Sequence, residues 1–200
     1  LTLNILSSLN LQVPLSERLS KGFEKNIYIN KTSGSSGDPF IFGRGSEEID
    51  FVESFGIPTA VVPGISSSVA VPAYQGISLT KRGVSESFWV ITGTTSDRKL
   101  SNDVALAAQS SATVVILMGM SKLAQIVNLF QNESKGASPI AIIQNGTTPK
   151  EKIGVGTIDT IQQVVAEKKL SSPAIIVIGE VVRESNKLKD FYHDYLIEKR

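Results

Sequence analysis

Short apolar runs rich in β-branched residues alternate along this chain with segments whose apolar residues recur every three or four positions. The run at 113–118 (Thr-Val-Val-Ile-Leu-Met) precedes a segment with Leu123, Ile126 and Phe130 on one side, and another apolar run follows at 140–143. The first pattern is typical of a buried strand and the second of an amphipathic helix. Their regular alternation predicts an α/β fold.

The predicted elements cover the chain from residue 46 onward. The expected strands are at 57–62, 87–92, 113–118, 140–143, 152–157 and 174–178. The expected helices are at 46–55, with Ser46 as its N-cap, and at 66–74, 102–109, 121–130, 158–168 and 186–198. Before residue 46 the pattern is sparse, with a helix-like segment at 1–9 and a candidate strand at 26–29. We therefore expect an incomplete α/β domain at 1–85 and a more complete one at 86–200, divided after the Gly83 turn.

Charge and cysteine content exclude several classes of protein. Twenty Lys and Arg residues against nineteen Asp and Glu give a net charge of +1, so no general field attracts nucleic acid or a membrane surface. The chain has no cysteine for disulfides or thiolate metal sites, and its one histidine, His193, lies in a charged segment typical of a solvated surface. The apolar runs are shorter than the ~20 residues that span a bilayer. We expect a cytoplasmic protein with no resident metal.

Glycine-containing turns lie next to several of the expected strands and helices. They are Gly-Asp-Pro-Phe-Ile-Phe-Gly-Arg-Gly at 37–45, Pro-Gly-Ile-Ser-Ser-Ser at 63–68, Leu-Met-Gly at 117–119 and Gln-Asn-Gly-Thr at 144–147. Open α/β sheets bind ligands where strands end, and glycine lets the backbone approach a ligand closely. The alternative is purely structural: a tight turn with Phe40 and Phe42 in the core, and an ordinary helix cap at Ser66.

Taken together and in this order, these motifs resemble the uroporphyrinogen-III C-methyltransferase branch of the tetrapyrrole methylase family. The resemblance extends from Gly37 to about Val182 and includes Gly-Ile-Pro at 56–58, Val-Val-Pro-Gly-Ile-Ser-Ser at 61–67 and Ser-Pro-Ala at 172–174. It implies two α/β domains of the tetrapyrrole methylase type, with the active site in the cleft between them, and a homodimer. The implied enzyme transfers two methyl groups from S-adenosylmethionine to uroporphyrinogen III, giving precorrin-2 for sirohaem or cobalamin and releasing S-adenosylhomocysteine. No metal is needed.

The resemblance also assigns roles to individual residues. It implies S-adenosylmethionine contacts at Ser36, Gly37, Asp38, Ile41, Ser66, Ser67, Met118 and Gly146. The family usually has glycine where Ser36 stands. Lys31 corresponds to the family's functional lysine and is the implied proton donor. Because the tetrapyrrole carries many carboxylates, Arg44, Lys81 and Arg82 are expected to bind it, although Lys81 and Arg82 also fit solvated surface charge.

Three features of the family are not found in this sequence. Neither the amino-terminal glycine-rich turn nor the following Tyr-Asp segment is seen, and the helix expected after Lys31 is missing. We therefore expect that amino-terminal segments of the family are missing here, either because the chain is truncated or because segments are left out and the numbering runs on across the gap. The rival hypotheses are a methylase of the same fold acting on another tetrapyrrole, a ribosomal RNA ribose or a modified histidine, and a noncatalytic cofactor-binding scaffold. The sequence has no basic, aromatic-interleaved stripe, which counts against RNA.

Overall fold

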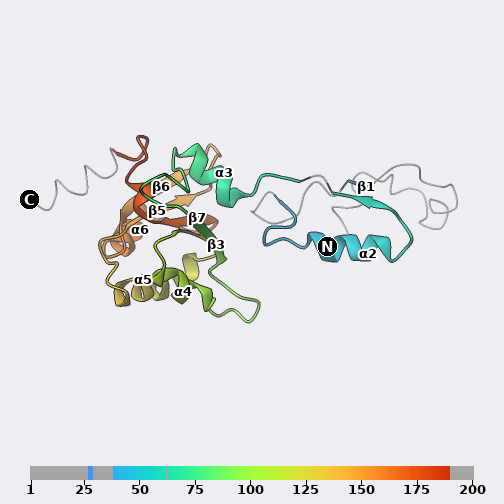
Figure 1. Cartoon of the computed structure of the whole chain (residues 1–200), viewed down its shortest axis with the longest axis horizontal. Coiled ribbons are helices and arrows are strands. Elements are labelled where there is room, and N and C mark those ends of the chain that lie inside the picture. The colour runs from blue at the N-terminus through green and yellow to red at the C-terminus, as the bar shows by residue number, and fades with distance from the viewer. Residues whose placement is uncertain (1–26, 29–37, 62, 190–200) are drawn as a thin grey trace, which may run out of the picture. The chain divides into compact units, whose positions relative to one another are not determined.

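The chain divides into two units, Leu1–Ser66 and Ser67–Arg200. The computed structural model describes residues 27–28, 38–61 and 63–189. The first unit contains β1 (Ile27–Tyr28), α2 (Gly45–Glu53) and β2 (Thr59–Ala60). The second contains α3 (Ser67–Tyr74), β3 (Phe88–Thr92), α4 (Asp103–Gln109), β4 (Thr113–Leu117), the 3₁₀ helix η2 (Met120–Lys122), α5 (Leu123–Asn132), β5 (Pro139–Gln144), β6 (Lys152–Thr157), α6 (Ile161–Lys168), β7 (Ala174–Ile178) and the 3₁₀ helix η3 (Glu180–Val182) (Figure 1).

This order of elements confirms the predicted α/β fold. The expected strands and helices between residues 87 and 178 are all present, with ends that shift by a few residues. Within the second unit, α3 packs against β4 and β7. The domain division expected between residues 85 and 86 stays a prediction.

The first unit differs from the expectation at two points. The strand predicted at 57–62 contracts to β2, whose two residues are only half-buried and pair in parallel with β1. The expected N-cap at Ser46 is wrong, because α2 begins at Gly45 with Arg44 in the cap position. The first helical hydrogen bond runs from the N–H of Glu48 to the carbonyl oxygen of Arg44 at 2.9 Å, and the N–H of Gly45 donates to the carbonyl oxygen of Pro39 at 2.9 Å.

A five-stranded mixed sheet, in the order β3-β4-β7-β5-β6, forms the centre of the second unit. Strands β3 and β4 are parallel, and β7 lies antiparallel between β4 and β5. Strand β5 therefore runs in the same direction as β3 and β4, while β6 pairs with it antiparallel at the other side. As a result, β3, β4 and β5 all end at one edge of the sheet.

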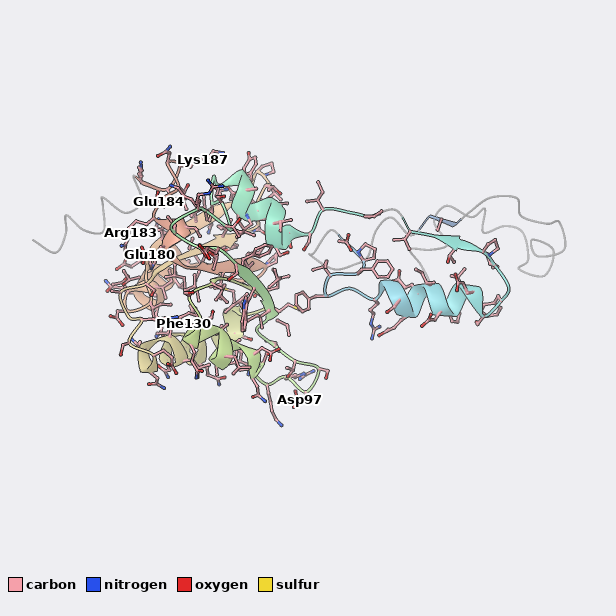
Figure 2. All side chains as sticks on the ribbon, viewed as in Figure 1. Asp97, Phe130, Glu180, Arg183, Glu184 and Lys187 are labelled. Atoms are coloured by element: carbon pink, nitrogen blue, oxygen red, sulfur yellow. The ribbon has the colours of Figure 1, made fainter. Side chains whose placement is uncertain are left out.

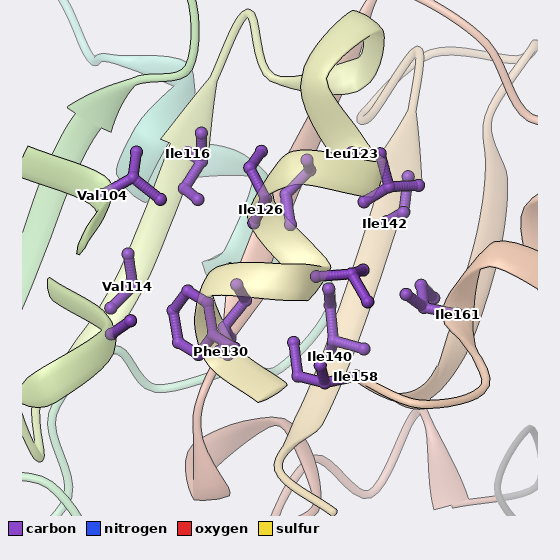
Figure 3. Packing of buried hydrophobic residues seen from close by; sticks show 14 of the residues in the cluster. Val104, Val114, Ile116, Leu123, Ile126, Phe130, Ile140, Ile142, Ile158 and Ile161 are labelled. Carbon is purple, nitrogen blue, oxygen red and sulfur yellow. The ribbon is translucent and has the colours of Figure 1, made fainter. Parts of the chain in front are cut away.

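Both faces of this sheet are buried. Ile116 and Ile142 belong to a cluster shared with α4, α5 and α6, whereas Val115 and Ile143 belong to a second cluster on the opposite face. Side chains alternate along a strand, so a strand covered on both faces must be apolar throughout. Figure 3 shows the first cluster, with Phe130 of α5 packed among strand residues. No helix in the described ranges is long and apolar enough to cross a bilayer.

Candidate functional site

The sheet topology brings two of the predicted cofactor residues to the same edge. Leu117 at the end of β4 and Ile143 near the end of β5 both lie opposite Ile175 of β7. With a strand spacing of ~4.8 Å, these two strand ends are roughly 10 Å apart across β7. Met118 follows the first and Gly146 the second. They therefore come from either side of β7 to the edge where α/β sheets place ligands.

The turn that follows β4, at Met118 and Gly119, is held by the turn that follows β3. The hydroxyl of Thr94 donates to the carbonyl oxygen of Met118 at 2.8 Å, and the N–H of Gly93 donates to the carbonyl oxygen of Leu117 at 2.7 Å. A Cβ at Gly93 would lie 2.4 Å from the Cα of Gly119, so the two backbones pack directly together. Met118 has a φ of 55° and its side chain is half-exposed. Gly93 and Thr94 were missed in the sequence, although a glycine-threonine pair directly after a strand is the signal that could have identified them.

The β5 turn packs closely under helix α3. A Cβ at Gly146 would lie 2.5 Å from Val71 Cγ1 and 3.2 Å from Ile143 Cγ2. Gly146 stands between two residues in the left-handed region, Asn145 with φ 49° and Thr147 with φ 66°. Close approach to Val71 therefore explains the glycine at this position.

Backbone strain gathers at this edge. Of the seven described non-glycine residues with positive φ, four lie on the turns after β3, β4 and β5, namely Arg98, Met118, Asn145 and Thr147. Each such residue costs about 1–2 kcal/mol, and strain of this kind is commonly retained where a site requires it. The positions of these four residues agree with these turns as the candidate site of the unit.

The loop after β3 is further ordered by its own polar contacts. Figure 2 marks Asp97 on this loop. The Thr95 hydroxyl donates to the Asp97 carboxylate, and this hydrogen bond, with the nearby Lys99 ammonium, lowers the pKa of Asp97.

A carboxy-terminal segment fixes the end of α3 above the β5 turn. The Ser185 hydroxyl donates to the carbonyl oxygen of Gln75 at 2.6 Å, and the Lys187 ammonium lies 4.8 Å from the centre of the Tyr74 ring. Leu188 is fully buried and belongs to the same hydrophobic cluster as Val71. These contacts hold α3, and with it Val71, in place against Gly146.

Ser67 at the start of α3 has a hydroxyl suited to a bound ligand. Its Oγ is buried and has no hydrogen-bond partner among the described residues. A buried polar group without a partner costs free energy, which a hydrogen bond to a ligand would remove. The neighbouring Ser66 is also buried. A hydroxyl without a partner among the described residues and turns at strand ends fit a nucleoside-containing ligand such as S-adenosylmethionine.

The glycine-rich turn of the first unit is built around Asp38. Its Oδ1 accepts the N–H of Phe40 at 2.8 Å, and its Oδ2 accepts the N–H of Gly64 at 3.0 Å. A Cβ at Gly43 would lie 2.4 Å from the carbonyl oxygen of Pro39, so glycine is required for the turn to close. The Asp38 carboxylate therefore holds the 38–45 turn to the 63–64 segment.

The apolar residues of this turn are exposed. Phe40, Ile41 and Phe42 have exposed fractions of 48%, 39% and 45%. The structural alternative that Phe40 and Phe42 belong to the core is therefore wrong. Ile41, a predicted cofactor contact, stands in this exposed group.

The three predicted substrate cations have different surroundings. Arg44 Nε lies 3.3 Å from Glu47 Oε2, and both side chains are exposed. The Lys81 ammonium pairs with Glu184, labelled in Figure 2, and this hydrogen bond together with the positive charge lowers the pKa of the Glu184 carboxyl. Arg82 is exposed beside it.

Three further predicted residues, Lys31, Ser36 and Gly37, lie outside the described residues. Among the residues that the structure does describe, no group of three or more His, Asp or Glu side chains is placed to hold a metal ion.

The fold is that of an α/β protein whose candidate ligand site lies at the carboxyl ends of its strands. The family model of the tetrapyrrole (corrin/porphyrin) methylases matches residues 33–162. The chain belongs to this family, which confirms the resemblance read from the motifs.

Relatives with known names agree on the branch of the family. The uroporphyrinogen-III C-methyltransferase of Methanocaldococcus jannaschii is 42% identical over 148 residues, which are 73% of this chain and 61% of that protein. The siroheme synthase of Nitrosomonas europaea is 34% identical over 181 residues, 90% of this chain and 38% of that protein. The chain thus spans only part of the length of these relatives.

A solved structure shows the same fold. The uroporphyrin-III C-methyl transferase of Thermus thermophilus is 30% identical, and its native form matches 73% of this chain and 61% of its own with a TM-score of 0.62. Its complex with S-adenyl homocysteine matches 73% of this chain and 64% of its own with a TM-score of 0.60.

Proposed function

We propose that this chain is part of an S-adenosylmethionine-dependent C-methyltransferase that converts uroporphyrinogen III to precorrin-2 by two methyl transfers. Family membership, the uroporphyrinogen-III C-methyltransferase among its relatives and the S-adenyl homocysteine complex of the Thermus thermophilus protein support this proposal. The product would serve sirohaem or cobalamin synthesis.

The bound cofactor supplies a methyl group already activated on a sulfonium. The residues of the chain therefore need to bind and orient the cofactor and the tetrapyrrole and to exclude water, rather than provide a nucleophile. Met118 and Gly146 would hold the cofactor at the edge of the sheet, and the Ser67 hydroxyl would donate to it. Asp38 would act through its turn, because its carboxylate accepts backbone N–H groups. Ser66, Ile41, Ser36 and Gly37 complete the proposed contacts.

Binding of the tetrapyrrole is assigned to cations. Arg44 has an exposed guanidinium whose partner, Glu47, is also exposed, so a substrate carboxylate can replace it. Lys81 and Arg82 are proposed in the same role, and Lys31 as the proton donor. The family further suggests a two-domain protein with its active site in the cleft between domains, working as a cytoplasmic homodimer.

One observation carries the proposal: in a chain of this family, Met118 and Gly146 follow the two strands that flank β7 at the same edge. The test is to incubate the full-length protein with methyl-labelled S-adenosylmethionine and enzymatically generated uroporphyrinogen III and to weigh the product. Two labelled methyl groups per tetrapyrrole are expected. A folded protein that binds S-adenosylhomocysteine but leaves uroporphyrinogen III unmethylated would point to a methylase for another substrate or to a scaffold.

Arg44 provides a sharper test of the substrate assignment. We expect Arg44→Ala to raise KM for the tetrapyrrole while leaving affinity for S-adenosylhomocysteine unchanged. Glu47→Ala is the matched control, because it breaks the same ion pair but keeps the guanidinium. Normal tetrapyrrole kinetics in Arg44→Ala would remove Arg44 from the site.

A further inference from the structure

The Glu151 carboxylate links two segments that are far apart in the sequence. Its Oε1 accepts a hydrogen bond from Gln75 Nε2 at 2.8 Å, and its Oε2 accepts one from the backbone N–H of Thr147 at 2.7 Å. Gln75 follows α3 and is only 5% exposed, and Glu151 is half-buried. Each carboxylate oxygen thus has one donor, and together they join the end of α3 to the β5 turn.

Thr147 is the residue of this turn that most needs such support. It is β-branched, and its φ of 66° is a genuine outlier for a residue of this kind. Such a conformation persists only where the surrounding structure holds it. The backbone N–H of Glu151 donates to the Thr148 carbonyl oxygen at 3.1 Å, which turns the chain back so that the carboxylate reaches Thr147.

We propose that Glu151 is a positioning residue for cofactor binding. Its carboxylate fixes the turn at Asn145–Thr147 against the end of α3, so that the backbone of Gly146 is held in the position that contacts the ligand. This inference rests on the proposed function, in which Gly146 contacts S-adenosylmethionine. It assigns Glu151 and Gln75 a role although neither touches the cofactor in that proposal.

The donors and acceptors predict a distinctive pattern of variants. In Glu151→Gln the new amide can accept from Thr147 and donate to Gln75, whose own amide rotates to present its oxygen, so both bonds survive. In Gln75→Glu alone, two carboxyl groups face each other and the N–H donor of the glutamine is lost. Combining Gln75→Glu with Glu151→Gln restores a donor opposite each acceptor.

The experiment is calorimetric titration of the full-length protein and its variants with S-adenosylhomocysteine, together with steady-state kinetics. We expect Glu151→Ala to bind about tenfold more weakly, with KM for S-adenosylmethionine raised by a similar factor and kcat little changed. Glu151→Gln should bind within about twofold of the wild type, and Gln75→Glu should be weakened unless Glu151→Gln is added. Glu133→Ala is the matched control, because Glu133 also accepts from a glutamine, Gln109, but between α4 and α5.

The outcomes separate this inference from the function on which it rests. If the wild type binds and Glu151→Ala binds equally well, the positioning role is overturned while the proposed function stands. If the folded wild type does not bind, the proposed function fails and the role of Glu151 with it. Where thermal unfolding shows that Glu151→Ala does not fold, the paired variant decides: binding no better than that of Gln75→Glu alone refutes the role.

Discussion

Replacing Gly146 by alanine tests the close contact between the β5 turn and helix α3. The φ of Gly146 lies outside the left-handed region, so the backbone accepts alanine at this position. The added Cβ would lie 2.5 Å from Val71 Cγ1 and 2.9 Å from Val71 Cγ2. Carbon atoms prefer separations of ~3.5–4.0 Å, so the overlap is roughly 1 Å and either α3 or the turn must move. Overpacking of this kind costs about 1–3 kcal/mol.

A second substitution makes the prediction specific. Val71→Ala alone removes two buried methyl groups, a loss of about 1.6 kcal/mol at ~0.8 kcal/mol per group, plus a cavity contribution. In the double variant, the methyl group introduced by Gly146→Ala enters the space that the valine side chain vacates. We therefore expect the double variant to be about 1–2 kcal/mol more stable than the sum of the single effects.

Urea unfolding, analysed with one shared m-value, measures the free energies of unfolding. Calorimetric titration measures the affinity for S-adenosylhomocysteine. Affinity should fall in Gly146→Ala and recover at least partly in the double variant. Gly154→Ala is the control, since its Cβ would crowd Leu170 Cδ1 at 2.6 Å within the β6–α6 layer. It should lower stability without changing affinity. If the effects of Gly146→Ala and Val71→Ala on the free energy of unfolding sum to that of the double variant within ~0.5 kcal/mol, the reasoning is refuted.

Three further predictions concern a buried side chain, a candidate cofactor residue and an ion pair. Ile126→Ala, at a fully buried position in α5, should lower the free energy of unfolding by about 2–5 kcal/mol, whereas Leu106→Ala at a mostly exposed position should change it little, as urea titration will show. Met118→Ala should weaken S-adenosylhomocysteine binding in calorimetry and leave the unfolding midpoint almost unchanged. Lys81 lowers the pKa of Glu184 below its ordinary 4.5, so this pair contributes stability above that pH and loses it as pH falls through the lowered value. The stability difference between wild type and Glu184→Gln should accordingly vanish in acid, and a difference that persists there would contradict the pairing.

The strands could be predicted because their local pattern is unambiguous. The runs that became β4, β5 and β7 are short, apolar and rich in β-branched residues, so burial on both faces was the natural interpretation. The order of the strands was not predictable in this way. Strand β7 comes last of the five and lies antiparallel between β4 and β5, and this long-range pairing leaves no mark in any local segment.

The residues of the candidate site could likewise be predicted only where a local motif marks them. Met118 and Gly146 could be singled out from their motifs, and the edge that unites them follows from the sheet topology. Glu151 could not, because its role depends on Gln75, a residue 76 positions away that α3 brings within hydrogen-bond distance. Ser46 failed as a cap because the helical hydrogen bonds of α2 already begin at the carbonyl oxygen of Arg44.

Calorimetric titration of the full-length protein with S-adenosylhomocysteine tests the central claim most directly. We predict saturable binding of one ligand per chain, weakened by Met118→Ala and by Gly146→Ala but not by Gly154→Ala. No heat of binding in a protein shown to be folded, or binding that neither Met118→Ala nor Gly146→Ala weakens, would contradict the placement of the cofactor at this edge.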